Sequence, residues 1–256
     1  MPERPDSATT RSVQIIGPGR AGQSLADALS AVGWTVAPLL GRADLLPGVD
    51  LTGLFRSIDV VVLAVPDDTI AEVARRLPQQ AAPVLHLSGS RPLSELAPHA
   101  RPGSLHPLVS LPNARVGSER LLDNCFFAVS GDPITIDIAE SLGGRWAEVT
   151  DDNRARYHAA ATVASNHAVA LAAQVEALAA STGLEADPFY ELMITTLESV
   201  RRLGPRAALT GPASRGDWDT IRSHLAAIEP DQRDFYRAAF VQALTLTSLT
   251  PPKDLA

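Results

Sequence analysis

The sequence lacks the features that mark several large classes of protein. Its single cysteine, Cys125, excludes an intramolecular disulfide, and the apolar residues around it predict a buried thiol in a reducing cytosol. The net charge of −7 and the lack of any basic cluster exclude the electrostatic footprint of a nucleic-acid-binding protein. No apolar run approaches the length of a membrane span, and the polar residues 1–11 predict a frayed tail rather than a signal peptide. We therefore expect a cytoplasmic protein that binds neither nucleic acid nor membrane.

Two kinds of enzyme site are also missing. The six histidines show no paired spacing of the kind that metal sites use, and Cys125 has no second cysteine, so we expect no bound metal. The sequence has no Gly-x-Ser-x-Gly motif, which would place a nucleophilic serine on a sharp turn. Neither metal nor serine-hydrolase chemistry is therefore expected.

A glycine-rich turn is the clearest motif that is present. An apolar run at residues 13–16 leads into Gly-x-Gly-x-x-Gly, and a helical pattern rich in Ala and Leu follows. Strand, turn and helix in this order form the fingerprint of a dinucleotide site, with another glycine-rich α/β turn as the alternative. Gly17 permits the tight turn, Gly19 lets a pyrophosphate approach the backbone, and Gly22 lets the helix pack closely. The predicted cofactor contacts in the turn are Gly17, Pro18, Gly19, Arg20, Ala21 and Gly22.

The end of the second predicted strand, residues 34–40, distinguishes NADP from NAD. NAD-binding proteins carry an acidic residue at this place, which binds the ribose hydroxyls. Here Gly41 and Arg42 follow the strand, and a guanidinium suits a 2′-phosphate. We therefore predict NADP, bound by Arg42. The alternatives are that Arg42 is a solvated loop residue, or that Asp44 binds a ribose because the strand ends later.

The next segments predict a sheet covered on both faces. Residues 58–66 form a nearly continuous apolar run, typical of a buried parallel strand, and residues 83–87 form another short strand. Ligands of open α/β sheets bind at the loops that follow the carboxyl ends of the strands. The residues that we expect to face the cofactor there are Val65, Pro66, Ser88 and Gly89.

Alternating strands and helices continue to about residue 149, and only helical patterns follow. The predicted fold is α/β: a doubly wound, mostly parallel Rossmann sheet over residues 11–150, then a smaller all-helical domain over residues 151–256. The helices expected in the second domain span residues 155–180, 188–203, 217–228 and 231–249.

Two polar positions in these domains suggest chemistry. His106 follows the fifth strand-like segment, where a side chain with a near-neutral pKa can donate a proton to a substrate or accept one from it. The alternative is a structural histidine that caps the turn before Pro107. On the long helix, His158 and Asn166 can share one face. An amide in an Ala-rich helix needs partners, either a substrate or nicotinamide, or a neighbouring helix.

A glycine-rich loop at residues 209–217 supplies the last candidate. Asp217 is a plausible N-cap for the next helix, and Arg215 could clamp a substrate carboxylate through two parallel hydrogen bonds. The alternative is a surface arginine beside a helix cap.

Six motifs follow one another in an order that resembles a known family. They are G-P-G-R-A-G, D-V-V-V-L-A-V-P-D-D, H-L-S-G-S, L-H-P-L, Y-H-A-A-A-T-V-A-S-N-H and L-T-G-P-A-S-R-G-D. From residue 11 onward the chain resembles bacterial proteins that join a Rossmann-like NADP-binding domain to a helical domain of unknown function (DUF2520 type). They are part of the 6-phosphogluconate dehydrogenase-like group, with pyrroline-5-carboxylate reductase, ketopantoate reductase and prephenate dehydrogenase. The resemblance implies a homodimer formed through the helical domain.

The resemblance also implies roles for single residues. His106 and Pro107 match part of the H-P-M motif that carries the catalytic histidine of prephenate dehydrogenases. Asn166 matches an asparagine of the β-hydroxyacid dehydrogenases, but Thr162 stands where those enzymes have a lysine. We therefore expect His106, His158 and Asn166 to be catalytic residues, with His106 as the first choice of proton donor and His158 as the second. Arg215 is expected to bind the substrate.

These observations predict an NADP-dependent oxidoreductase that reduces a small carbonyl or imine acid. The alternative is a non-catalytic, NADP-binding regulatory dimer, which the missing lysine favours. The sequence determines neither the substrate nor the direction of the reaction.

Overall fold

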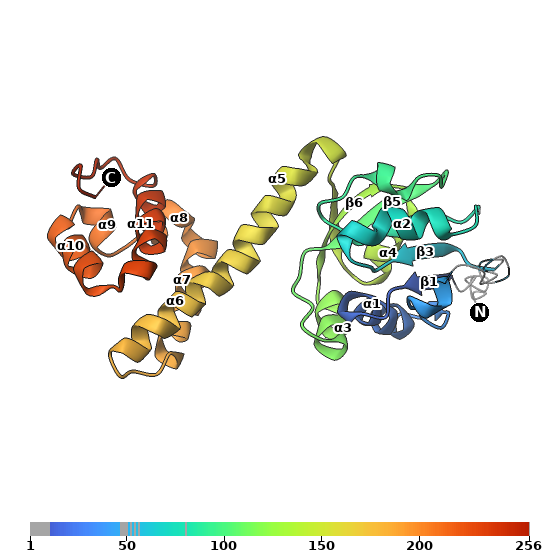
Figure 1. Cartoon of the computed structure of the whole chain (residues 1–256), viewed down its shortest axis with the longest axis horizontal. Coiled ribbons are helices and arrows are strands. Elements are labelled where there is room, and N and C mark those ends of the chain that lie inside the picture. The colour runs from blue at the N-terminus through green and yellow to red at the C-terminus, as the bar shows by residue number, and fades with distance from the viewer. Residues whose placement is uncertain are drawn as a thin grey trace, which may run out of the picture. The chain divides into compact units, whose positions relative to one another are not determined.

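The computed structural model describes residues 11–46, 51, 53, 55, 57–79 and 81–255, which form two compact units (Figure 1). The first unit extends to Ser165 and the second begins at Asn166. The predicted domain boundary at residues 150 and 151 is the point where helix α5 (Asp151–Thr162) begins, and α5 belongs to the first unit. The tail predicted over residues 1–11 lies, apart from Arg11, outside the described residues.

The first unit contains a mostly parallel sheet, as predicted. Its described strands have the order β2-β1-β3-β4-β5-β6-β7. Only β5 and β6 are antiparallel neighbours; the other neighbouring pairs are parallel. The strands are β1 (Ser12–Ile16), β2 (Thr35–Val36), β3 (Val60–Leu63), β4 (Val84–His86), β5 (Pro102–Pro107), β6 (Phe126–Gly131) and β7 (Arg145–Glu148).

Helices cover both faces of this sheet. Strand β3 shows the reason in its sequence, because Val60 and Val62 pack into one apolar cluster and Val61 and Leu63 into the other. The first cluster includes buried side chains of α1, α3 and α4, and the second includes those of α2. The helices of this unit, besides α5, are α1 (Arg20–Ala31), α2 (Ile70–Arg76), α3 (Ala114–Leu122) and α4 (Ile134–Ser141).

The second unit is helical in the part of the chain that the structure describes. Its small core is formed by Ile221, Leu225, Phe240, Leu244 and Leu255. No helix among the described residues is both long and apolar enough to cross a membrane. The helices are α6 (Ala168–Ser181), α7 (Asp187–Leu203), α8 (Pro205–Ala208), α9 (Pro212–Arg215), α10 (Trp218–Ala227) and α11 (Pro230–Leu244).

Several predicted elements differ from the observed ones. The strand expected at residues 34–40 is reduced to β2, with one further bridge between Ile16 and Leu40. The long helix expected at residues 155–180 is interrupted by a π-helical turn, Val163–His167, where the Ser165 hydroxyl donates to the Ala161 carbonyl and competes with the helical ladder. The last helix, α11, ends at Leu244 rather than residue 249.

Helix α3 was not predicted at all. It is short, and only Gly117 and Leu121 of it are buried, so it lacks the apolar stripe that marks a helix in sequence. Gly117 packs against α1 so closely that a Cβ would lie 2.0 Å from the Ser24 hydroxyl oxygen. Small residues at this helix–helix contact therefore replace the expected apolar pattern.

Candidate functional site

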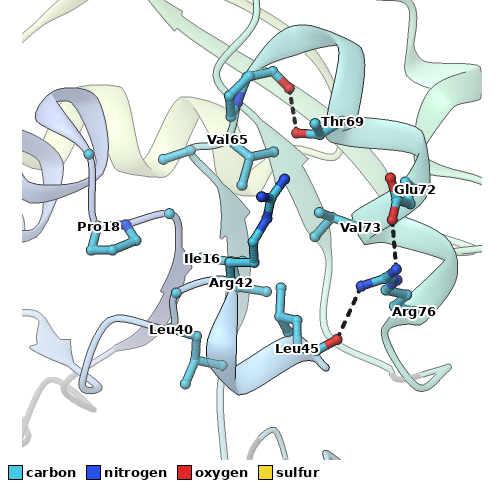
Figure 2. Close-up of a pocket in the computed structure, with 15 residues that line it drawn as sticks. Ile16, Pro18, Leu40, Arg42, Leu45, Val65, Thr69, Glu72, Val73 and Arg76 are labelled. Atoms are coloured by element: carbon cyan, nitrogen blue, oxygen red, sulfur yellow. Dashed lines mark hydrogen bonds and ion pairs between the residues drawn. The ribbon is translucent and has the colours of Figure 1, made fainter. Parts of the chain in front are cut away.

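A pocket opens where the strand order reverses. The chain runs from β1 outward to β2, then returns to the other side of β1 as β3. The loops that follow β1 and β3 diverge at this point, which is where open α/β sheets bind ligands. Figure 2 shows the resulting cavity of about 340 Å³. Its lining includes the turn after β1, the segment around Arg42, the end of β3, and helix α2.

The three glycines of the turn have different surroundings. Gly17 has a φ of 111°, and a Cβ on it would lie 2.2 Å from the Ala64 carbonyl oxygen. A Cβ on Gly22 would lie 1.9 Å from the Gly17 carbonyl oxygen. At Gly19, which is the N-cap of α1, a Cβ would meet no atom within 4 Å. Two glycines are thus required by the protein's own packing, while the space beside Gly19 is left for a ligand.

Arg42 extends into the same pocket. Figure 2 shows its side chain among the residues that line the cavity, which include Val65 and Thr69. Among the described residues, no hydrogen bond or ion pair engages that guanidinium, whereas Arg76 contacts Glu72 at 2.7 Å and the Leu45 carbonyl at 3.3 Å. Arg42 is therefore available to an anionic ligand.

Asp44 has a different role from the ribose contact that we considered. Its Oδ2 accepts a hydrogen bond of 2.8 Å from the backbone N–H of Gly41, and Asp44 is not part of the pocket lining. The carboxylate shapes the turn that carries Arg42 and does not face the cavity. This arrangement favours the guanidinium over the carboxylate as the group that meets a ligand.

A second pocket, of about 440 Å³, adjoins the first. Both are lined by Gly19, Ala64, Val65 and Pro66, and the second also reaches His106. Arg20 and Ala21 of the glycine turn line the second pocket, and Pro18 lines the first. The two pockets together provide a continuous surface along the carboxyl ends of the parallel strands.

Ser88 and Gly89, which were expected to face the cofactor, line neither pocket. The Ser88 hydroxyl is buried and donates to Asp67 Oδ2 at 2.6 Å, and the Ser90 hydroxyl donates to the same oxygen at 2.7 Å. Gly89 lies directly against two histidines, because a Cβ on it would be 2.9 Å from His106 Nε2 and 2.9 Å from His158 Cδ2. That Ser88 and Gly89 contact the cofactor stays a prediction.

His106 lies within β5, not after it as the sequence suggested. The parallel register pairs His86 with Ser104, so His106 extends beyond the end of β4 at the carboxyl edge of the sheet. Its Nδ1 is 2.6 Å from the Tyr157 hydroxyl oxygen, and its ring meets that of His158 edge-on with centroids 6.2 Å apart. The structure thus brings together the two predicted proton donors.

Tyr157 and His158, which contact His106, belong to a stripe of polar side chains on helix α5 that faces the sheet. Arg154, Tyr157 and His158 are its least exposed residues near the sheet, at i, i+3 and i+4. The Arg154 guanidinium is 3% exposed and donates to the hydroxyls of Ser104, at 3.0 Å, and Ser130, at 2.7 Å. Sequence reasoning missed Arg154 and Tyr157 because a search for apolar periodicity does not detect a polar face; the spacing itself was the available signal.

Burial keeps the His106 ring and the Tyr157 phenol uncharged near neutral pH. Desolvation, reinforced by His158 and Arg154 and opposed by Asp67, lowers the pKa of His106 to about 4. Burial likewise raises the pKa of the Tyr157 phenol to about 12. Among the described residues, no group of three His, Cys, Asp or Glu side chains is placed to hold a metal ion.

Asn166 and Arg215 belong to the second unit. Asn166 lies in the π-helical turn, and Arg215 is the last residue of α9, a short helix inside the segment that we predicted to be a loop. The Arg215 side chain is 61% exposed and lies 3.5 Å from Asp217. Asp217 accepts a hydrogen bond from the Thr220 N–H, so the predicted N-cap is confirmed. That Asn166 and Arg215 bind the substrate stays a prediction.

Comparison with known families finds a match to part of this chain. Residues 125–242 match the family model "Domain of unknown function (DUF2520)". The matched region begins at Cys125 and includes His158, Asn166 and Arg215, but neither the glycine turn nor His106. No protein of curated function matches the sequence.

Solved structures match over nearly the whole chain. A protein from Bacteroides fragilis, provisionally described as an NADP oxidoreductase, has a TM-score of 0.77 and 20% identity, over 92% of this chain and 98% of its own. Protein TM1727 from Thermotoga maritima has a TM-score of 0.72 and 24% identity, over 91% and 97%. Pyrroline carboxylate reductase from Plasmodium falciparum, solved with NADP bound, has a TM-score of 0.59 and 13% identity, over 94% and 99%. These matches establish a Rossmann-like α/β fold followed by a helical region.

Proposed function

We propose that this protein is an NADP-dependent oxidoreductase that reduces a small carbonyl or imine acid. The observation that carries the proposal is the Arg42 guanidinium, which has no partner among the described residues and lies in a pocket that adjoins the open space at Gly19 and continues to His106. The names of the solved neighbours support it, since they include an NADP-bound pyrroline carboxylate reductase and imine reductases. Those neighbours share the fold, so they suggest the class of reaction and not the substrate.

The residues of the first pocket fit NADP in kind and in place. The N–H groups at the start of α1 would bind the pyrophosphate, because the first turn of a helix has no internal acceptors for them. Gly19 leaves room for that approach, and Arg42 would bind the 2′-phosphate. Bound NADPH would supply the hydride for the reduction.

The second pocket supplies the protein's own chemistry. A carbonyl or imine that accepts a hydride gains negative charge on oxygen or nitrogen, so it needs a hydrogen-bond donor. Thr162 cannot replace the lysine of the β-hydroxyacid dehydrogenases, and the only lysine of this chain is Lys253. His106 lines the pocket and is the donor that we propose, with Arg215 as the clamp for the substrate carboxylate and Asn166 as a further hydrogen-bond partner.

The cofactor assignment is tested by titrating the protein with NADPH and following fluorescence quenching. The wild type should bind, and Gly19→Val should lose binding without losing the fold, because the new side chain fills the space beside Gly19 and clashes with no protein atom at Cβ. Circular dichroism and thermal unfolding of the variant report the fold. Unchanged quenching in a folded Gly19→Val protein would contradict the site.

The reaction is tested by oxidation of NADPH against a panel of 2-keto acids and cyclic imine acids. Turnover of one panel member supports the oxidoreductase. Tight NADPH binding without turnover of any member would instead favour the alternative that Thr162 suggests, a non-catalytic NADP-binding dimer.

We also propose that the protein is a homodimer formed through the helical domain. Helix α7 has no buried residue, and large apolar side chains of α6 and α7 are exposed, including Val169 at 70%, Leu192 at 63% and Leu197 at 64%. Exposed apolar area of this kind marks interaction surfaces, and the same helices of a second copy would cover it.

A further inference from the structure

We infer that Tyr157 fixes His106 in the tautomer that carries its proton on Nε2, and so makes His106 a permanent hydrogen-bond donor in the pocket beside the glycine turn. Tyr157 acts through His106 and is a positioning residue, because it does not line that pocket itself. The inference rests on the proposed function only for the identity of the group that receives the hydrogen bond.

The contact between the two side chains sets the tautomer. Tyr157 Oη and His106 Nδ1 are 2.6 Å apart, and only one of them can donate the shared hydrogen. A phenol is a stronger acid than a neutral imidazole N–H, and an imidazole nitrogen is a stronger base than a phenol oxygen. The Tyr157 hydroxyl therefore donates to Nδ1, and the proton of the neutral ring must lie on Nε2.

The Nε2 atom of His106 is available to bind a ligand. Among the described residues, no hydrogen bond reaches Nε2, although His106 lines a cavity of about 440 Å³. Residue 89 is a glycine, and any other residue there would place its Cβ 2.9 Å from Nε2. The absence of a side chain at Gly89 thus leaves His106 Nε2 accessible, although Gly89 itself lines neither pocket.

The rest of α5 holds the tyrosine in place. Arg154, one turn earlier on the helix, is buried against the hydroxyls of Ser104 on β5 and Ser130 on β6. These bonds attach the helix to the strand that carries His106, so Tyr157 and His106 have a common support. Besides its hydrogen-bond partner Tyr157, the groups that act on His106 are His158, Arg154 and Asp67. Burial, reinforced by His158 and Arg154 and opposed by Asp67, lowers the pKa of His106 and leaves its ring neutral at neutral pH.

The tautomer matters because of the charge that a reduction creates. A neutral imidazole with a proton on Nε2 stabilises an oxygen or nitrogen that becomes negative as hydride arrives. The other tautomer would present a lone pair there and repel the same atom. Loss of the Tyr157 hydroxyl should therefore reduce transition-state stabilisation while leaving cofactor and substrate binding nearly unchanged.

The first test needs no substrate. Two-dimensional NMR of ¹⁵N-histidine-labelled protein at neutral pH distinguishes a protonated ring nitrogen from an unprotonated one, and His106→Asn assigns the signal. We expect wild-type His106 to be neutral, with the proton on Nε2. In Tyr157→Phe the same signal should move toward a mixture of tautomers. A proton on Nδ1 in the wild type, or an unchanged tautomer in a folded Tyr157→Phe protein, would overturn the inference.

The chain offers a matched control. His224 Nδ1 lies 2.7 Å from the Tyr236 hydroxyl, in a pair of the same kind that belongs to the second unit. Tyr236→Phe should change the His224 signal and leave that of His106 unchanged. Once a substrate is known, Tyr157→Phe should lower kcat about tenfold with KM and NADPH affinity changed by less than about twofold, while Tyr236→Phe should not affect kcat.

The two proposals fail in different ways. If the wild type shows the Nε2 tautomer but does not bind NADPH, the proposed function fails and the role of Tyr157 stands. If NADPH binds and the panel is reduced while Tyr157→Phe keeps wild-type kcat, the proposed function stands and the positioning role is wrong.

Discussion

The Arg42 guanidinium is available to a ligand because the charged side chains near it already have other partners. Asp44, the nearest acid in sequence, is engaged by the Gly41 N–H, and Arg76 is engaged by Glu72. One guanidinium thus faces the pocket with no competing carboxylate bound to it among the described residues. At the scale of single residues, selectivity for a 2′-phosphate depends on how each neighbouring charge is already paired.

Arg42 should therefore decide the choice of cofactor. We expect NADPH to bind at least about tenfold more tightly than NADH, a difference of about 1.4 kcal/mol, and Arg42→Ala to remove the preference. The measurement is the dissociation constant of each cofactor by fluorescence titration. Arg75→Ala is the matched control, since Arg75 is exposed and does not line the pocket. Equal affinities for the two cofactors in the wild type would contradict the role of Arg42.

His86 makes stability depend on pH. It is fully buried, and neither ring nitrogen has a hydrogen-bond partner among the described residues. Burial, reinforced by Arg154, lowers its pKa from 6.5 to about 4. The unfolded chain therefore binds more protons than the folded one between these values, and stability is lost as the pH falls below about 6.5.

The expected loss from His86 alone is about 2 kcal/mol between roughly pH 7.5 and pH 5. Urea unfolding at several pH values measures it. His86→Leu should flatten the dependence, and the slope that is left should come in part from His106, whose pKa shifts in the same direction. A wild-type stability that does not change across this range would show that His86 is protonated or hydrated in the folded protein.

At the scale of elements, the glycine turn and helix α5 shape the carboxyl edge of the sheet in two different ways. The turn relies on the absence of side chains: β1, α1 and the end of β3 approach so closely that Gly17 and Gly22 have no room for a Cβ. Helix α5 relies on the presence of polar ones, because Arg154 and Tyr157 bind groups on β5 and β6. Both arrangements place functional groups at the carboxyl edge of the same sheet.

The turn predicts a contrast between two alanine substitutions. Gly22→Ala should lower the free energy of unfolding by about 1–3 kcal/mol or more, because its Cβ would overlap the Gly17 carbonyl oxygen. Gly19→Ala should leave stability nearly unchanged and weaken NADPH binding. Thermal unfolding and cofactor titration of both variants test the contrast. Equal stability of the two would mean that the packing around Gly22 is looser than the structure shows.

At the scale of the whole molecule, the two units differ in how they bury apolar area. The first has two large apolar clusters on opposite faces of its sheet, whereas the described core of the second is small. Helices α6 and α7 leave several leucines exposed. A second copy of the chain is the partner that we propose for them.

Leu197→Glu should therefore shift the protein from dimer toward monomer, because a charge would be buried in the proposed interface. Analytical ultracentrifugation over a range of concentrations measures the change. Leu46→Glu, an equal substitution at a leucine of the first unit that is 53% exposed, is the control and should leave the dimer intact. A monomeric wild type would contradict the proposal directly.

The sequence alone determined the features that depend on residues close together in the chain. The strand–glycine–helix unit at Gly17, the alternation of strands and helices, and the helical second half are local patterns, and the structure confirms them. Predictions were less accurate where a distant contact replaces local preference. The expected strand at residues 34–40 is shortened to β2, and α3 packs through Gly117 without an apolar stripe.

Only the tertiary structure decided which polar groups act together. His106 and Tyr157 are 51 residues apart in sequence and meet because α5 returns to the carboxyl edge of β5. Arg154 reaches Ser104 and Ser130 only because β5 and β6 are neighbours. A hydrogen bond depends on the position of two atoms to within a few tenths of an ångström, and that position is set by strand order and helix packing. Residue types and spacing therefore predicted the kind of site, and the fold selected its partners.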